Sequence, residues 1–112
     1  MSCIFCKIIE GSIPGEKLYE DESMIIIKDI SPQATLHYLL IPKEHYPNIK
    51  EMSALQAATL GDCIKKLGEL AEGLGLKEGF RIVSNCGKHG CQSVEHLHIH
   101  ILGGEQLSPK MS

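Results

Sequence analysis

Three histidines alternate with apolar residues in the run from His96 to Leu102, which reads HLHIHIL. Successive side chains of a β-strand point to opposite faces, so this run predicts a strand with three imidazoles on one face. Residues two apart on a strand are separated by roughly 6.6 Å, which lets the three rings act on one small substrate. A solvated strand face is the plain alternative. However, three of the six histidines lie here, directly after a polar loop, Cys86 to Ser93, that contains two glycines.

Two kinds of chemistry suit such a cluster. Histidines can bind a catalytic metal that activates water. Alternatively, one imidazole attacks phosphorus while its neighbours hydrogen-bond the phosphoryl oxygens and the leaving group. An unperturbed pKa of about 6.5 leaves much of an imidazole neutral near pH 7. A metal site usually has carboxylates nearby, but the adjacent carboxylate, Glu95, is predicted to point to the opposite face.

Cysteines form a second pattern. Cys3 and Cys6 have the Cys-x-x-Cys spacing of half a structural zinc site, which needs two further ligands. Five cysteines is an odd number, and the N-terminus has no visible export signal. They are therefore interpreted as free thiols or metal ligands in a reducing, cytoplasmic setting. Two packed thiols in a short helix are the alternative.

The elements that position these residues follow from periodicity and end signals. Apolar spacing in residues 3–10 predicts a short helix ended by Gly11. Ser53 and Gln56 form a capping box that begins one long helix, and Gly73 and Gly75 are its stop signal. Strands are predicted at Glu16–Glu20, Met24–Lys28, Leu36–Ile41, Phe80–Asn85 and His96–Leu102. Consecutive hairpins with helices set between them favour an α+β fold with an antiparallel sheet of about five strands.

Composition limits the classes of partner. With 112 residues, 43% hydrophobic and 22% charged, residues 1–112 are expected to form a single domain. The net charge of −3 leaves no basic surplus for a nucleic-acid backbone. The apolar stretch Met24–Ile27 is far shorter than the roughly 20 residues that span a bilayer. We therefore expect neither nucleic acid nor membrane as a partner, whereas a small phosphate-bearing ligand needs only a local site.

The run HLHIHIL matches the histidine triad signature, His-φ-His-φ-His-φ-φ with φ apolar, and nearly the whole chain resembles the nucleotide-binding branch of the histidine triad family. The segments that carry this resemblance are Ile4-Phe5, Lys7–Ile9, Asp29–Ala34, His37–His45, Gly90–Val94 and Leu102–Gly104. The pair Gly103-Gly104 is similar to that branch, whereas the dinucleoside polyphosphate hydrolases usually have Pro-Arg there. The resemblance implies a homodimer in which the long helix and the sheet edge near Phe80–Asn85 meet across a two-fold axis.

The resemblance also implies catalytic roles. His98 becomes the nucleophile on the α-phosphorus of a nucleoside monophosphate derivative, oriented by a backbone carbonyl that accepts from its other nitrogen. His100 hydrogen-bonds the phosphoryl or bridging atom, Ser93 contacts the departing amine, and His37 lies near the phosphate. His96 completes the triad. No metal is required for this chemistry.

For nucleotide binding, the resemblance implies a carboxylate at Asp29 that accepts from the ribose hydroxyls. Phe5, Ile8 and Ile30 match positions that line the base pocket, with core packing as the alternative. Asn85 matches a polar residue close to the sugar and phosphate. The full implied set is Phe5, Ile8, Asp29, Ile30, Asn85, Gln92, Ser93, Val94, His98 and His100.

Some bacterial members of the family complete the cysteine pair with the histidine of Pro-Lys-x-His and the first histidine of the triad. Those positions are His45 and His96 here. The resemblance therefore implies that Cys3, Cys6, His45 and His96 bind Zn²⁺ in a structural role.

Taken together, the predicted function is hydrolysis of purine nucleoside phosphoramidates and aminoacyl nucleotides through a nucleotidylated histidine, with release of a nucleoside monophosphate. The alternatives are a dinucleoside polyphosphate hydrolase and a nucleotide-binding regulatory or scaffold protein with weak turnover. The chain departs from the branch at Cys91, where glycine is usual. Its C-terminal segment, Glu105–Ser112, lacks the tryptophan of the animal members, so the preference for a leaving group stays open.

Overall fold

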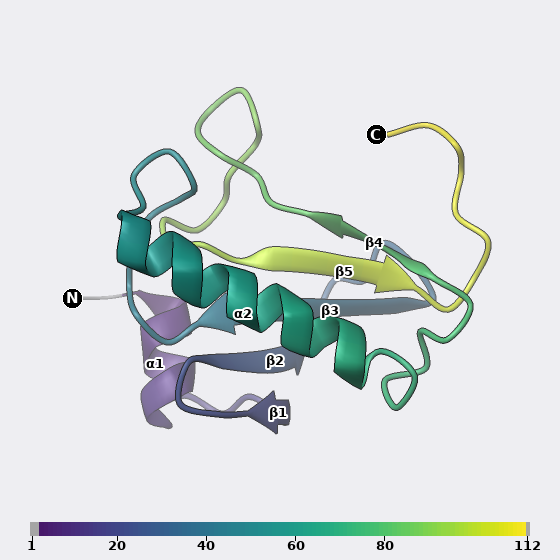
Figure 1. The fold of residues 1–112 in the computed structure, drawn as a ribbon, viewed down its shortest axis with the longest axis horizontal. Coiled ribbons are helices and arrows are strands. Elements are labelled where there is room, and N and C mark those ends of the chain that lie inside the picture. The colour runs from purple at the N-terminus through teal and green to yellow at the C-terminus, as the bar shows by residue number, and fades with distance from the viewer. Residues whose placement is uncertain (1–2, 112) are drawn as a thin grey trace.

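The computed structural model describes residues 3–111. The elements, in chain order, are α1 (Ile4–Glu10), β1 (Lys17–Glu20), β2 (Met24–Lys28), β3 (Leu36–Pro42), α2 (Ala54–Leu70), β4 (Phe80–Val83) and β5 (Ile99–Gly103). The strands form one sheet in the order β1-β2-β3-β5-β4, and each neighbouring pair is antiparallel. The predicted α+β class, with about five antiparallel strands, one long helix and one short N-terminal helix, is confirmed (Figure 1).

The two helices cover opposite faces of the sheet. Residues of β2 alternate, so that Met24 and Ile26 belong to the core under α2, whereas Ile25 and Ile27 belong to a second core under α1. The α2 core contains Leu60, Cys63 and Leu67 from the helix itself; the α1 core contains Phe5 and Ile8. The central strands are thus buried on both sides, which holds β3 and β5 rigidly behind any side chain that projects from them.

Helix α1 begins and ends as the sequence predicts. Cys3 is its N-cap, and the thiol sulfur accepts a hydrogen bond from the Cys6 N–H at 3.4 Å. Gly11 ends the helix with φ 86°, a left-handed conformation that favours glycine. Both cysteines therefore lie in the first turn of α1, at the end that Figure 1 places beside the N-terminus.

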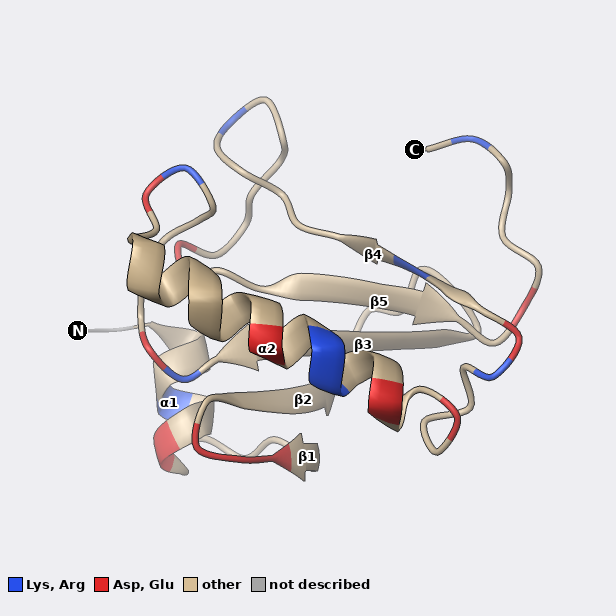
Figure 2. Cartoon of the chain, viewed as in Figure 1, with Lys and Arg blue, Asp and Glu red and all other residues tan. Residues whose placement is uncertain are grey.

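Helix α2 begins with the predicted capping box. The Ser53 side chain accepts from the Gln56 N–H, and the Gln56 side chain accepts from the Ser53 N–H. Figure 2 shows acidic and basic residues interspersed along its outer side. Lys65 and Glu69 form an ion pair at 2.9 Å, an exposed contact that contributes little to stability.

The histidine strand is shorter than predicted. β5 begins at Ile99, so His96 and His98 lie in the irregular segment just before it, and β4 ends at Val83 instead of Asn85. The cause is that backbone groups here bond outside the sheet. The N–H of Leu97 donates to the Tyr46 carbonyl at 2.8 Å, and the carbonyl of His98 accepts from the Ser84 hydroxyl at 3.2 Å.

Within residues 3–111, no helix is both long and apolar enough to cross a membrane.

Candidate functional site

His98 has a defined tautomer. Its Nδ1 lies 2.8 Å from the backbone oxygen of His96, and a carbonyl can only accept, so Nδ1 carries the proton. The neutral ring then presents an unprotonated Nε2. Phe5 from α1 packs its ring edge-on against His98, with ring centroids 5.0 Å apart. The imidazole is therefore fixed in position with one nitrogen able to attack an electrophile.

A chain of hydrogen bonds sets the tautomer of a second imidazole. The N–H of Gln33 donates to His37 Nδ1 at 2.9 Å, so the proton of neutral His37 is on Nε2. That Nε2–H lies 2.8 Å from His100 Nδ1 and donates to it. The proton of His100 is consequently on its own Nε2, where it can be donated to a ligand. The rings of His98 and His100 are neighbours, with centroids 5.2 Å apart.

One carboxylate lies beside this chain. Asp29, which directly follows β2, places Oδ2 3.3 Å from His37 Nε2 and 3.9 Å from His100 Nδ1. Its other oxygen accepts from the Ser31 N–H at 2.7 Å. Glu95 is the carboxylate adjacent to the triad in sequence, but Asp29, which the resemblance assigns to the nucleotide site, is brought beside His37 and His100 by the β2–β3 pairing.

Burial decides the charge of these rings. It lowers the pKa of His37, while the neighbouring carboxylate of Asp29 opposes this shift. Burial likewise lowers the pKa of His100, and the nearby rings of His98 and His37 add to the effect. Both imidazoles are neutral near pH 7, as the hydrogen-bond chain requires. The strands β3 and β5 contain no lysine or arginine, so the donors that these two strands offer to the site are neutral N–H groups.

The same geometry bears on the question of a catalytic metal. Asp29, His37 and His100 offer ligand atoms that all lie within 4.8 Å of one another. However, His37 Nε2 carries a proton that it donates to His100 Nδ1, so neither nitrogen presents a free lone pair to an ion. The arrangement favours a hydrogen-bond chain over a metal centre at this position.

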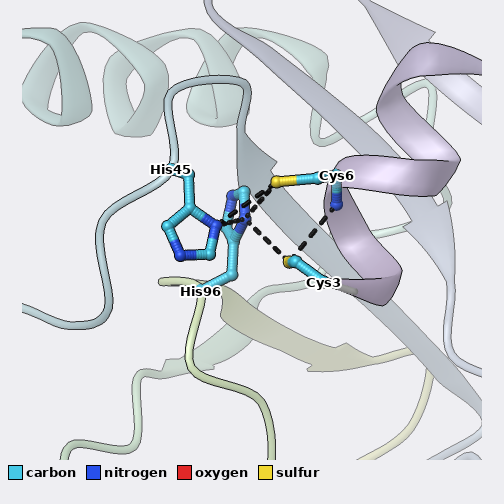
Figure 3. A group of neighbouring side chains, drawn as sticks. All are labelled: Cys3, Cys6, His45 and His96. Carbon is cyan, nitrogen blue, oxygen red and sulfur yellow. Dashed lines mark hydrogen bonds between the residues drawn. The ribbon is translucent and has the colours of Figure 1, made fainter. Parts of the chain in front are cut away.

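A separate cluster lies on the far side of His96. The side chains of Cys3, Cys6, His45 and His96 converge from α1, the segment after β3 and the segment before β5 (Figure 3). His96 Nδ1 lies 3.4 Å from Cys3 Sγ, 3.6 Å from Cys6 Sγ and 3.1 Å from His45 Nδ1. Cys6 Sγ lies 3.3 Å from His45 Nδ1.

These distances fit a tetrahedral ion. Bond lengths of about 2.3 Å to sulfur and about 2.0 Å to nitrogen place ligand atoms roughly 3.3–3.8 Å apart. His96 Nε2 lies 2.8 Å from the Pro42 carbonyl and must donate to it, so His96 Nδ1 has a lone pair directed into the cluster. Two thiols and two imidazoles are a donor set that suits zinc.

The remaining predicted residues are placed as follows. Phe5 and Ile8 are buried in the α1 core, as the packing alternative anticipates, although the Phe5 ring also contacts the His96 and His98 rings. Ile30, next to Asp29, is 98% exposed. Asn85, Ser93 and Val94 lie on the connection between β4 and β5.

Gln92, which the resemblance places among the nucleotide-binding residues, holds the loop before the histidines through its side-chain amide. Its side-chain NH₂ donates to the carbonyls of Pro47 and Val94, and its oxygen accepts from the Gly87 N–H and the Asn48 side chain. The amide thus holds the loop before the histidines in shape. Three backbone groups also belong to the site: the N–H of Gln33 and the carbonyls of Pro42 and His96. No sequence pattern identifies such groups.

A small α+β protein whose triad histidines are held in defined tautomers beside a carboxylate is a candidate for group-transfer chemistry, and comparison with known proteins gives the class. The family model described as "Scavenger mRNA decapping enzyme C-term binding" matches residues 2–112. A protein of Escherichia coli strain K12 named purine nucleoside phosphoramidase is 40% identical over 110 residues, covering 97% of this chain and 92% of the relative.

Two solved structures are also similar. A HIT family hydrolase from Clostridium thermocellum superposes with a TM-score of 0.93 at 46% identity, covering 99% of this chain and 97% of that one. A zinc-bound histidine triad family protein from Mycobacterium smegmatis has a TM-score of 0.80 at 33% identity, covering 100% of this chain and 81% of that one. The chain belongs to the histidine triad (HIT) family, and it is a hydrolase of that family.

The lowered pKa values of His37 and His100 predict how stability depends on pH. Below about pH 6.5 the unfolded chain binds more protons than the folded one, so the free energy of unfolding falls as the pH drops toward the lowered pKa values. Above about pH 6.5 both states hold neutral rings, and the contribution of the two histidines to stability is complete. Each ring contributes at most about 1.4 kcal/mol per pH unit. Urea unfolding between pH 7.5 and 5.5 measures this slope. His100→Asn, which cannot titrate, is expected to flatten it; an unchanged slope in this variant would contradict the assignment.

Proposed function

We propose that the protein hydrolyses purine nucleoside phosphoramidates and aminoacyl nucleotides through a nucleotidylated His98. The observation that carries the proposal is the hydrogen bond from His98 Nδ1 to the His96 carbonyl, which leaves Nε2 unprotonated. The similarity to the purine nucleoside phosphoramidase of E. coli supports the substrate class.

In the first step, His98 Nε2 attacks the α-phosphorus. A phosphorus–nitrogen bond to the imidazole forms while the bond from phosphorus to the substrate amine breaks, and the departing amine takes up a proton from solvent. Ser93 is proposed to contact that amine. His100 donates its Nε2–H to a phosphoryl oxygen, and His37 keeps this donor in the correct tautomer.

In the second step, water attacks the same phosphorus. The bond from phosphorus to the imidazole breaks and its electron pair returns to His98 Nε2, the attacking water loses a proton to solvent, and the nucleoside monophosphate leaves the restored enzyme. Donors fixed before the reaction stabilise the charge that develops on the phosphoryl oxygens. Because the imidazoles are neutral, they bind a phosphate monoanion through N–H groups and not through a buried cation.

The nucleoside is proposed to lie on the α1 side of the sheet, beside the second core. Asp29 accepts from the ribose hydroxyls, and the exposed side chain of Ile30 packs on the base. Phe5 and Ile8 support that surface from within the α1 core. Asn85 and Val94 are proposed to contact the nucleotide directly, and Gln92 acts through the loop that it holds.

Replacing the nucleophile tests the reaction. For His98→Ala we expect turnover of adenosine 5′-phosphoramidate to fall at least about a thousandfold, because the other unprotonated triad nitrogens are engaged: His96 Nδ1 faces the cysteine–histidine cluster and His100 Nδ1 accepts from His37. Release of AMP, followed by chromatography, is the measurement. His89→Gln changes an exposed ring on the loop before the triad and should keep wild-type turnover. Turnover by His98→Ala equal to that of the wild type would contradict the proposal.

We also propose that Cys3, Cys6, His45 and His96 hold one structural Zn²⁺. The ion would join α1 to the segments around β3 and β5 and add its binding free energy to folding. All five cysteines are free thiols in the structure, and a reducing cytoplasm would keep the ligand pair in that form. The zinc-bound relative from M. smegmatis supports the proposal.

Metal analysis tests this site. We expect one zinc per chain, and Cys3→Ser should lose most of it because one of two thiolate ligands is gone. Replacement of zinc by Co²⁺ should give the near-ultraviolet absorption of thiolate–cobalt bonds. Cys86→Ser, a cysteine outside the cluster, is the matched control and should retain both signals. Full zinc content in Cys3→Ser would rule out the proposed ligand set.

We further propose that two copies of the chain pair through β4 and α2. β4 lies at the edge of the sheet and exposes Phe80 (38%) and Ile82 (42%). On α2, Gly61, Ile64 and Gly68 share the exposed side, and a Cβ at either glycine would meet no atom within 4 Å. An unpaired edge strand beside a smooth helix face is suited to a two-fold interface.

Light scattering after size-exclusion chromatography tests the pairing. The wild-type protein should have twice the chain mass of 12.3 kDa. Ile82→Lys places a charge on the edge strand and should give the mass of one chain. Ile49→Lys, which changes an exposed isoleucine on the loop before α2, should leave the dimer intact. A wild-type monomer at micromolar concentration would contradict the proposal.

A further inference from the structure

We propose that His96 is a positioning residue that couples the cysteine–histidine cluster to the nucleophile. In this proposal, the metal ligands Cys3, Cys6 and His45 hold His96 in place, and the backbone of His96 holds His98. The effect of the coupling on catalysis rests on the proposed function. The effect on the His98 ring can be measured without any substrate.

His96 has a bonding partner in each of three directions. It is fully buried, at 0% exposed. Its Nδ1 faces the cluster, its Nε2 donates to the Pro42 carbonyl at 2.8 Å, and its own carbonyl accepts from His98 Nδ1 at 2.8 Å. If His96 shifts out of the position in which its Nδ1 faces the cluster, its carbonyl shifts as well. That carbonyl is the acceptor that selects the His98 tautomer.

The backbone around His96 lacks the usual support of a sheet. The pairing of β5 with β3 begins at Ile99, opposite Leu40, so residues 96–98 lie outside the regular pairing. The N–H of Leu97 donates instead to the carbonyl of Tyr46. Tyr46 directly follows the ligand His45, and neither residue belongs to a helix or strand. The two irregular segments are thus held to each other by this backbone bond, by the cluster and by the Gln92 side chain, which bonds Pro47 and Asn48.

Helix α1 provides a second connection. Phe5 lies between the two cysteine ligands in sequence, and its ring packs edge-on against both His96 and His98, with centroid distances of 5.9 and 5.0 Å. The first turn of α1 is anchored by Cys3 and Cys6. If the cysteines release their metal, the ring that packs against the nucleophile loses part of its support as well.

One consequence follows for the kinetics. Loss of the metal should lower kcat more than it raises KM, because substrate contacts from Asp29 and Ile30 do not involve the cluster whereas the direction of His98 does.

The experiment compares His45→Gln and Cys6→Ser with the wild-type holoprotein. His45 is exposed, so its replacement removes a ligand with little loss of packing. Cys63→Ala is the matched control, because it removes a buried cysteine from the α2 core, away from the cluster. Five quantities are measured for each protein: zinc per chain, Tm, kcat and KM for adenosine 5′-phosphoramidate, and the ¹⁵N NMR shifts of the His98 ring.

We expect both ligand variants to lose zinc and to show about a 10- to 100-fold lower kcat, the range seen when groups that orient a site are removed. The His98 ring should change from a single Nδ1–H form to a mixture of tautomers, and excess zinc should partly restore it in Cys6→Ser. Cys63→Ala should lower Tm while zinc content, kcat and the His98 shifts remain those of the wild type.

Two results would overturn the inference. One is a zinc-depleted protein whose His98 shifts and kcat equal those of the zinc-loaded protein. The other is a drop in kcat for Cys63→Ala that matches the ligand variants at equal loss of Tm, which would indicate general loosening. If the wild-type protein fails to hydrolyse the phosphoramidate, the proposed function fails, yet the response of the His98 shifts to zinc still decides the coupling.

Discussion

A single hydrogen bond, from His98 Nδ1 to the carbonyl of His96, determines what the site can do. The bond keeps the proton on Nδ1 and leaves Nε2 with a lone pair that can attack an electrophile. The fold serves this bond directly. The segment before β5 leaves the regular sheet pairing, and its carbonyl becomes available to an imidazole instead of a neighbouring strand. The irregularity at the start of β5 is therefore a requirement of the site.

Around that bond, the structure uses neutral donors where many phosphate sites use cations. The Gln33 N–H, His37 and His100 form a directional chain that ends in one available proton. Burial keeps these rings uncharged by lowering the pKa of each, and the Asp29 carboxylate opposes that shift without reversing it. A neutral donor holds a phosphate less tightly than a buried lysine or arginine, which would suit the release of the nucleoside monophosphate that we propose as product.

Much of this was accessible from the sequence, for identifiable reasons. The capping box at Ser53 and the left-handed Gly11 are local signals, so the start of α2 and the end of α1 were predicted correctly, whereas α2 ends at Leu70, before the predicted stop signal at Gly73 and Gly75. The alternation in HLHIHIL placed the imidazoles on one face even though the strand itself begins only at Ile99. The residue types alone do not indicate the roles of the Pro42 and His96 carbonyls, because a backbone group has no residue-type signature; a carbonyl that orients His98 was expected only from the family resemblance. The loop-holding amide of Gln92 and the approach of Asp29 to His100 depend on pairing between remote segments, which local patterns do not encode.

The most direct test of the account is to find where the nucleotide becomes attached. Wild-type protein mixed with adenosine 5′-phosphoramidate, quenched within one turnover and digested, can be searched by mass spectrometry for an adenylylated peptide containing residues 96–102. The account predicts a transient adduct on His98 that forms and decays at least as fast as the overall reaction. AMP released with no adduct at any time, or an adduct on His96 or His100, would contradict it.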